Sequence, residues 1–280
     1  MNVTLAKSAG FCPGVKRAVD IVYEQAETHS PVYTYGPIIH NDEVVQELGE
    51  KGVQTIDSLD EMDTVEPGIM IIRSHGVTWE EEETIRKKGF EVVDATCPFV
   101  KKIHRLVKEH EENGEQIVII GDENHPEVRG IMGWCKNHCT VLDCGEKAEN
   151  LKLDCSRKVC IVSQTTFNYK KFKEIVEILD KKGYDILALN TICNATEERQ
   201  TESRELAKQS DAMIVIGGRH SSNTQKLYEI CKKECENTYY IQTLVDLDLE
   251  KFKSFRNVGI TAGASTPNKI IKEVQTACQK

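Results

Sequence analysis

The 280-residue sequence has no long apolar run and no excess of positive charge. No stretch approaches the ~20 apolar residues of a membrane-spanning helix, and residues 1–20 lack the basic and then apolar pattern of a secretory signal. Lys and Arg number 36 against 45 Asp and Glu, so the formal net charge is −9, which disfavours binding to phosphate backbones. We therefore expect a cytoplasmic protein with neither a nucleic acid nor a membrane as partner.

Cysteine is the residue type that the chain has in excess, with eleven copies. Disulfides are rare in the cytosol, and an odd number of cysteines cannot all be paired. The remaining roles are metal ligation, thiol chemistry and packing as small apolar side chains. The position of each cysteine must decide between these roles.

Short apolar runs of strand length alternate with amphipathic stretches along the whole chain. This alternation is typical of α/β proteins with mostly parallel sheets. Strands are expected at residues 69–72, 91–93, 117–120, 159–162, 212–216 and 258–260. Helices are expected at residues 15–28, 79–88, 100–112, 169–182, 197–209 and 224–234.

Three strand-to-helix junctions resemble one another, and each contains one cysteine. They read SAGFCPGVKRAVD around Cys12, VDATCPFVKKIH around Cys97 and LNTICNATEERQ around Cys193. The intervals between them are close to the size of one small α/β unit. We therefore expect three similar domains, at residues 1–95, 96–191 and 192–280. A cysteine at a helix start is favoured as a thiolate by the partial positive charge of that helix end.

Polar side chains recur in the loops that follow the other apolar runs. The first segment has His40 and His75, the second has His125, Glu127 and Thr165, and the third has Ser221, Asn223 and Ser265. Ligands of open α/β sheets bind outside the carboxyl ends of the strands. If the three segments pack around a common axis with those ends inward, these loops and the three cysteines converge on one central pocket.

Each of these residues also has a purely structural interpretation. A single cysteine at a strand end is more often packed than ligating, and each histidine alone is as often a loop cap or a core residue as a functional group. Glu127 follows Pro126 at an expected helix start, where a carboxylate is favourable for its charge alone. Their recurrence in matching places, rather than any single residue, favours function.

Three cysteine ligands without a clear fourth indicate a particular chemistry. Structural zinc sites have four protein ligands, and electron-transfer clusters usually have four cysteines. Three thiolates on a 4Fe-4S cluster leave one iron open for Lewis-acid and redox chemistry. The helix starts at residues 222–224 and 265–267, with Ser and His donors, favour a phosphate or diphosphate ester as ligand.

Nine ordered motifs carry a resemblance to one family. They are GFCPGV, HN at His40, SHGV, DATCP, HPEVRG, SQTT, TICNAT, SSNT and TAGASTP. In this order the chain resembles, from end to end, the 4-hydroxy-3-methylbut-2-enyl diphosphate reductases, or LytB proteins, of the non-mevalonate isoprenoid pathway.

The resemblance implies a fold, a cofactor and roles for individual residues. It implies three pseudo-symmetric α/β domains around one 4Fe-4S cluster, which Cys12, Cys97 and Cys193 bind and which keeps an open iron for the hydroxyl of an allylic diphosphate. It implies reductive loss of that hydroxyl to give isopentenyl and dimethylallyl diphosphate, with a ferredoxin or flavodoxin as electron donor. It makes Glu127 the proton donor with Thr165 beside it, and it assigns the diphosphate to His40, His75, His125, Ser221, Ser222, Asn223 and Ser265.

The other eight cysteines leave two alternatives open. Cys135, Cys139 and Cys144, with His138, offer ligands for a zinc hydrolase, although their spacing does not match paired zinc ligands and free thiols are favoured. Cys231 and Cys235 are four residues apart on an expected helix and would share one face. The alternative for the chain as a whole is a non-catalytic phosphate-ester-binding or thiol- or metal-based regulatory protein, because a fold does not prove a reaction.

Overall fold

The computed structural model describes residues 1–137 and 139–279 and contains three four-stranded sheets. All the strand pairs within these sheets are parallel, which confirms the expected α/β class. The strands of sheet A are β11 (Thr238–Ile241), β10 (Ala212–Ile216), β12 (Asn257–Ala262) and β1 (Asn2–Leu5). Sheet B has β3 (Val53–Ile56), β2 (Val32–Tyr35), β4 (Ile69–Ile72) and β5 (Glu91–Asp94). Sheet C has β7 (Thr140–Leu142), β6 (Gln116–Ile120), β8 (Val159–Ser163) and β9 (Ile186–Ala188).

The three sheets repeat one topology. Each sheet has two inner strands and two edge strands. One edge strand comes directly after the first inner strand in the sequence, and the other edge strand leads to a cysteine. The cysteine-bearing edge strands are β1, β5 and β9, and each is followed by a long helix. These helices are α1 (Pro13–Thr28), α4 (Pro98–Glu112) and α8 (Asn194–Lys208).

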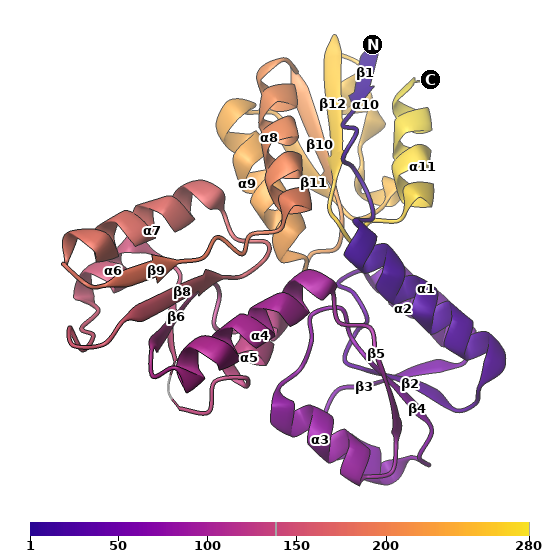
Figure 1. Ribbon diagram of the computed structural model, residues 1–280. Helices are drawn as coiled ribbons and strands as arrows, with labels where there is room; N and C mark the ends of the chain where they lie inside the picture. The colour runs from indigo at the N-terminus through magenta and orange to yellow at the C-terminus, as the bar shows by residue number, and fades with distance from the viewer. Residues whose placement is uncertain (138, 280) are drawn as a thin grey trace. The chain divides into compact units, whose positions relative to one another are not determined.

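The chain completes sheet A with both of its ends. The first strand, β1, pairs with β12 near the C-terminus, with Val3 opposite Val258. Figure 1 shows this N-terminal strand beside β12, with α11 (Asn268–Gln279) next to it. Asn2–Leu5 therefore belong to the same sheet as β10, β11 and β12, whereas the sequence assigned them to a first domain of residues 1–95. The boundaries at 95/96 and 191/192 themselves stay a prediction.

Helices cover both faces of sheet A. The side chains of Ile214 and Ile216 pack with Ile271 and Val274 of α11, while Met213 and Val215 pack with Leu227 of α9 (Ser222–Glu234) and with Ala207 of α8. Alternate residues of one strand thus enter opposite layers of the core. The run Ala212–Ile216 is apolar throughout because neither of its faces meets solvent.

Sheet C has the same two-sided construction. Val118 and Ile120 of β6 pack toward α7 (Tyr169–Lys181) and α6 (Gly145–Asn150), and Ile117 and Ile119 pack toward α4 and α5 (Pro126–Met132). The strand ends that hold functional loops are therefore fixed by a packed core. The remaining helices are α2 (Asp42–Glu50), α3 (Trp79–Lys87) and the short α10 (Leu249–Phe252), with 3-10 turns at Glu61–Thr64 and Leu244–Asp246.

The chain divides into two compact units, which we describe separately. Unit 1 comprises Met1–Lys16, Ile39–Glu47 and Asn194–Lys280 and contains sheet A. Unit 2 comprises Arg17–Ile38 and Leu48–Cys193 and contains sheets B and C. Within residues 1–137 and 139–279, no helix has both the length and the apolar character needed to cross a bilayer.

Candidate active site

Each of the three motif cysteines lies directly before a helix. Pro13 and Pro98 begin α1 and α4, and Asn194 begins α8, so the sequence expectation of cysteines at helix starts is confirmed. All three cysteines are half-buried. The thiols of Cys160 and Cys231 are buried in the core, and this burial raises the pKa of each to about 12. The motif cysteines are thus more accessible than Cys160 and Cys231, which pack in the core.

One backbone hydrogen bond recurs at all three cysteines. The amide of each donates to a carbonyl in the loop that follows the neighbouring inner strand, and that loop carries one of the expected site residues. The three bonds are Cys12 N to Ala264 O at 3.2 Å, Cys97 N to Ser74 O at 3.0 Å and Cys193 N to Thr165 O at 3.0 Å. Each cysteine is thereby held beside a substrate-binding candidate, namely Ser265, His75 or Thr165.

The sulfur of Cys12 already accepts a hydrogen bond. The backbone amide of Val15, in the first turn of α1, donates to Cys12 Sγ at 3.4 Å. Backbone amides that donate to sulfur are a common surrounding of metal-bound cysteines. The donor set at Cys12 therefore suits a metal ligand.

In unit 1 three hydroxyl-bearing or amide side chains gather at the start of α9. Ser221 caps the helix by accepting from the amide of Thr224 at 3.3 Å. Ser265 Oγ donates to the backbone carbonyl of His40 at 3.1 Å and lies 3.4 Å from Ser221 Oγ. Asn223 is only 5% exposed, and neither its amide nitrogen nor its oxygen has a hydrogen-bond partner among the described residues.

A helix start with these donors suits an anion. The N-terminal amides of a helix and nearby hydroxyls bind phosphate, and a buried amide without a partner costs free energy until a ligand pairs with it. Ser221, Asn223 and Ser265 are therefore brought together as the sequence predicts, with Ser222 in the first turn of the same helix.

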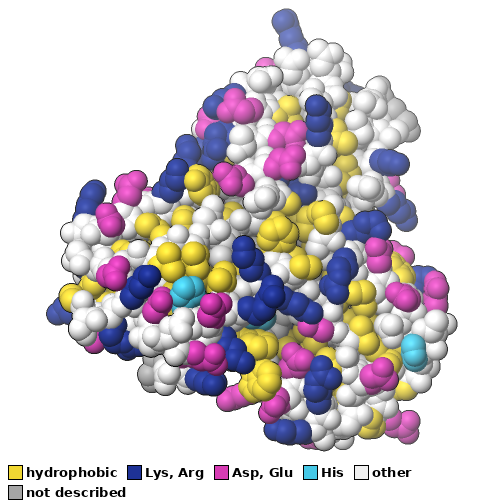
Figure 2. Space-filling view, in the orientation of Figure 1, with side chains coloured by type: hydrophobic (Ala, Val, Ile, Leu, Met, Phe, Trp, Pro, Cys, Tyr) yellow, Lys and Arg dark blue, Asp and Glu magenta, His cyan; other side chains and the backbone are white. Residues whose placement is uncertain are grey.

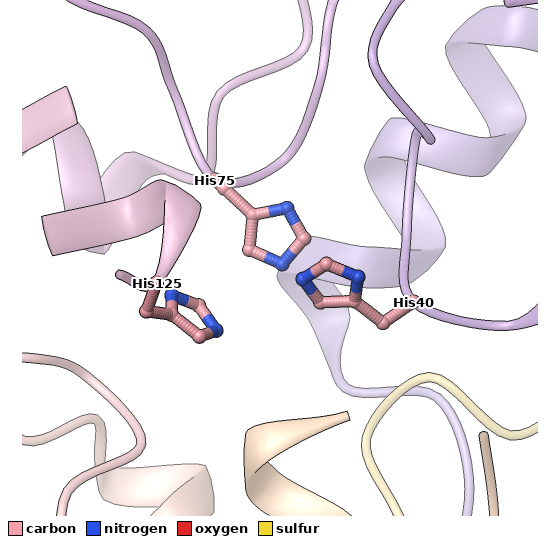
Figure 3. Close-up of side chains that lie close together, drawn as sticks. All are labelled: His40, His75 and His125. Atoms are coloured by element: carbon pink, nitrogen blue, oxygen red, sulfur yellow. The ribbon is translucent and has the colours of Figure 1, made fainter. Parts of the chain in front are cut away.

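In unit 2 two imidazoles lie next to each other. The rings of His75 and His125 are 5.5 Å apart in an edge-to-face arrangement. Figure 3 shows these two rings side by side. His125 caps α5, because its Nδ1 accepts from the amide of Glu127 at 3.1 Å. When Nδ1 is the acceptor, the proton of a neutral ring lies on Nε2.

Glu127 and Thr165 form a buried pair. Thr165 donates twice to the carboxylate, from its backbone amide to Oε1 at 2.6 Å and from Oγ1 to Oε2 at 2.7 Å. Glu127 is 2% exposed and Thr165 is 7% exposed. Burial raises the pKa of Glu127 to about 7, although both hydrogen bonds from Thr165 act to lower it. The carboxyl can therefore be protonated near neutral pH.

The raised pKa of Glu127 predicts a pH-dependent loss of stability. Its ordinary pKa is 4.5, so between about pH 4.5 and 7 the folded chain holds a proton that the unfolded chain releases. The contribution to stability is fully present below pH 4.5 and is lost as the pH rises through 7. Between pH 5 and 8, urea unfolding under anaerobic conditions should show the wild type losing about 2 to 3 kcal/mol relative to Glu127→Gln. The exposed neighbour variant Glu123→Gln should follow the wild type, and equal pH dependence in all three proteins would contradict the assignment.

Comparison with known proteins decides the family. A family model described as LytB protein matches residues 3–279. The chain belongs to the LytB family. It is 46% identical over 276 residues to the 4-hydroxy-3-methylbut-2-enyl diphosphate reductase of Caldanaerobacter subterraneus subsp. tengcongensis, covering 98% of this chain and 95% of the relative. It is 47% identical over 277 residues to the protein of that name from Clostridioides difficile, covering 99% and 98%.

Solved structures of LytB relatives agree with the fold. The E-1-hydroxy-2-methyl-but-2-enyl-4-diphosphate reductase of Plasmodium falciparum matches with a TM-score of 0.94 at 30% identity, over 100% of this chain and 88% of the other. A structure described as (E)-4-hydroxy-3-methyl-but-2-enyl diphosphate reductase, the terminal enzyme of the non-mevalonate pathway, matches with a TM-score of 0.70 at 42% identity, over 100% and 99%. The resemblance drawn from the nine LytB motifs is confirmed.

Two arginines support the cysteine loops of this LytB chain, and the sequence reading missed both. Arg199 of α8 is 3% exposed and donates to the carbonyls of Ser8 at 2.9 Å and Gly10 at 2.8 Å, in the loop before Cys12. Arg17 of α1 donates to Thr96 O at 3.3 Å, in the loop before Cys97. Each arginine lies near the second turn of the helix that follows a motif cysteine. The aligned cysteine junctions of the sequence already contain an arginine at both places.

The remaining cysteines of the LytB chain have structural surroundings. The thiols of Cys231 and Cys235 donate to the carbonyls of Ser203 and Ser210, at 3.7 and 3.5 Å. Cys231 lies in α9, whereas Cys235 ends it with extended backbone. Among the zinc candidates, a hydrogen bond joins the half-buried thiols of Cys135 and Cys139, Cys144 is exposed, and His138 lies outside the described residues. The described cysteines form no disulfide.

Proposed function

We propose that this chain is a 4-hydroxy-3-methylbut-2-enyl diphosphate reductase. It removes the allylic hydroxyl of its substrate reductively and gives isopentenyl and dimethylallyl diphosphate, in the last step of the non-mevalonate isoprenoid pathway. The curated relatives and solved structures bear this name over nearly the full length of the chain. The observation that carries the proposal is the threefold repeat of a half-buried cysteine at a helix start, tied by the same backbone bond to a loop with a polar side chain.

The cofactor of this proposal is one 4Fe-4S cluster with Cys12, Cys97 and Cys193 as its ligands. The residues fit such a cluster, since the three cysteines are half-buried at helix starts and the sulfur of Cys12 accepts a backbone amide. Amide donors to sulfur are also among the features that set a cluster's reduction potential. When bound, a cluster with only three protein thiolates supplies an iron with an open position, which combines Lewis-acid and redox chemistry.

The diphosphate is bound by hydroxyl, amide and imidazole donors in place of a lysine cluster. The start of α9 acts together with the side chains of Ser221, Ser222, Asn223 and Ser265. Phosphate oxygens give the side-chain amide of Asn223 the hydrogen-bond partners that it lacks among the described residues. The imidazoles proposed for the same ligand are His40, His75 and His125. In the neutral tautomer that α5 imposes on His125, Nε2 carries the proton and donates it in a hydrogen bond.

Protonation of the substrate is assigned to Glu127 through Thr165. A carboxyl with a pKa of about 7 is protonated in a large fraction of molecules at neutral pH, which suits a general acid. In its neutral form Glu127 can donate from Oε2 to Thr165 Oγ1, which reverses the hydrogen bond and frees the hydroxyl proton of Thr165. Thr165 thus orients the acid and presents a proton at Oγ1, while its carbonyl holds the amide of Cys193.

The reaction consumes two electrons and two protons and releases water from the C–O bond of the substrate. The electrons come from a ferredoxin or flavodoxin, and we place the reaction in the cytoplasm, where cysteines remain reduced.

A direct test measures products. Protein reconstituted anaerobically with iron and sulfide, and reduced by dithionite with methyl viologen, should convert 4-hydroxy-3-methylbut-2-enyl diphosphate into isopentenyl and dimethylallyl diphosphate. The diphosphates are removed enzymatically, the two alcohols are separated and quantified by chromatography, and their sum is compared with the substrate consumed. Binding of the substrate without turnover in fully reconstituted protein would favour the alternative of a non-catalytic phosphate-ester-binding protein.

A further inference from the structure

The outer face of α4 carries an unusual concentration of positive charge. Residues 98–108 contain four basic side chains and no carboxylate, in a chain whose net charge is −9. Lys101, Lys102, Arg105 and Lys108 lie at positions i, i+1, i+4 and i+7, which places them along one stripe of the helix. Figure 2 shows Lys and Arg side chains gathered over α4.

Part of this charge is not engaged within the chain. Lys101 pairs with Asp94 at 2.5 Å, and Lys108 lies over the ring of Trp79, 5.6 Å from its centre. Lys102 and Arg105 are exposed, and among the described residues neither has a carboxylate at ion-pair distance. Two of the four cations are therefore free to meet an outside partner.

A cavity of about 370 Å³ opens beside this stripe at the start of α4. Thr96 and Pro98 line it, and they flank the proposed cluster ligand Cys97 on both sides. Its two carboxylates are already paired, Asp94 with Lys101 and Glu82 with Arg86 at 2.9 Å. The other lining residues are Val77, His104, Arg105 and Trp134.

Packed aromatic side chains form an apolar area beside the basic stripe of α4. Trp134 stacks on the buried ring of His104 at 5.1 Å, and its indole nitrogen donates to Val77 O at 3.0 Å. Trp79 meets Trp134 edge-to-face at 5.5 Å. Trp79 and Phe99 are each 47% exposed, which is uncommon for large apolar side chains. Exposed aromatic groups surrounded by charged side chains are typical of protein–protein interfaces.

We infer that this surface, the α4 face, is the docking site of a small acidic electron-transfer protein of the ferredoxin or flavodoxin class, with electrons entering at Cys97. The α4 face comprises Trp79, Phe99, Lys101, Lys102, Arg105, Lys108 and Trp134. The inference rests on the proposed function and adds to it the place where the donor binds. Charge complementarity selects the occupant, because a chain with a net charge of −9 attracts an acidic donor best at a face rich in Lys and Arg.

The number of electrons that each turnover consumes requires the donor to bind briefly and repeatedly. Each turnover breaks one C–O bond of the substrate, takes up two protons and two electrons, and releases water. A one-electron donor must therefore bind, be oxidised and leave twice for each product molecule. Small interfaces steered by opposite charge permit such rapid exchange.

The test compares two double charge reversals in the full-length holoenzyme. Lys102→Glu/Arg105→Glu alters exposed residues of the α4 face, whereas the control Lys269→Glu/Lys272→Glu alters exposed residues of α11 at the same spacing. With a reduced acidic bacterial ferredoxin at low salt, the α4 variant should lose about tenfold or more in kcat/KM, and the control less than about twofold. The deficit should shrink as salt is raised. Turnover with dithionite and methyl viologen should stay unchanged in both variants.

A second readout does not depend on turnover. Carbodiimide cross-linking of ferredoxin carboxylates to this chain should map to Lys101, Lys102 and Lys108, and its yield should fall in the α4 variant but not in the control. Cross-links that map elsewhere, equal ferredoxin kinetics in both variants, or an equal loss with methyl viologen would each overturn the docking site. Failure of the parent protein to turn over with methyl viologen would instead refute the proposed reaction, and the cross-link map would still decide the docking site.

Discussion

Cys97→Ser protein, purified without oxygen, is expected to lose the brown absorption of its cluster and nearly all turnover. Serine keeps the size of the side chain but replaces the soft thiolate by a hydroxyl, which is a poor ligand for iron–sulfur clusters. Because only three protein ligands are proposed, the variant loses one of the three bonds that hold the cluster to the protein. The fall in turnover should therefore exceed the roughly 10- to 100-fold that loss of an outer-shell partner causes. Visible absorption, iron content and product formation measure the effect.

Cys144→Ser is the matched control for this variant. Cys144 also lies directly before a helix, α6, but its side chain is exposed and it lies outside the three repeated junctions. The control should keep the absorption and the turnover of the wild type. If Cys97→Ser retained a stable cluster and normal rates, the proposed ligand set would be wrong.

Glu127→Gln is expected to lower kcat by about 10² to 10⁴ while leaving the cluster spectrum intact. Glutamine has nearly the same shape, so the cavity stays filled and Cys193 keeps its bond to Thr165 O. The amide, however, cannot supply a proton of comparable acidity. In the wild type, kcat should fall as the pH rises through about 7, because the acid form of Glu127 disappears there.

Glu123→Gln provides the comparison, since Glu123 is an exposed carboxylate four residues before Glu127, in the loop that precedes α5. That variant should retain both the rate and the pH profile of the wild type. Turnover of Glu127→Gln within a few-fold of the wild type, with an unchanged profile, would leave Glu127 a structural role only.

The inner strands that are apolar throughout were predictable from the sequence. Ile69–Ile72 and Ala212–Ile216 are apolar at every position, because both of their faces are covered, and both strands were expected at these bounds. The inner strand β2 and the edge strands β1, β3, β7, β9 and β11 were not among the expected ones. These edge strands are only three or four residues long, and β1 and β9 have no buried residue. Their existence depends on pairing with a distant inner strand.

The return of the chain to sheet A was hidden for a related reason. A repeat read along the sequence places residues 1–11 with the residues that follow them, whereas β1 pairs with β12, more than 250 positions away. Nothing in the four residues of β1 specifies that partner. The repeat itself was visible, since each junction contains the same cysteine and helix start.

The candidate site was predictable as a set of residues, but its electrostatics were not. The motifs place Glu127 and Thr165 in separate loops, and only the fold brings the carboxylate within 2.6 Å of the Thr165 amide. The sequence favoured Glu127 at least as strongly as a carboxylate at a helix start, and it does lie in the first turn of α5, which His125 caps. The raised pKa of Glu127 arises from burial, which a motif does not record.

Iron and acid-labile sulfide analysis of anaerobically purified wild-type protein tests the central claim most directly. The claim is that Cys12, Cys97 and Cys193 together hold one 4Fe-4S cluster. It predicts about four irons and four sulfides per chain, together with the absorption that Cys97→Ser removes. Colourless protein after careful reconstitution, or one zinc per chain in place of iron, would contradict it.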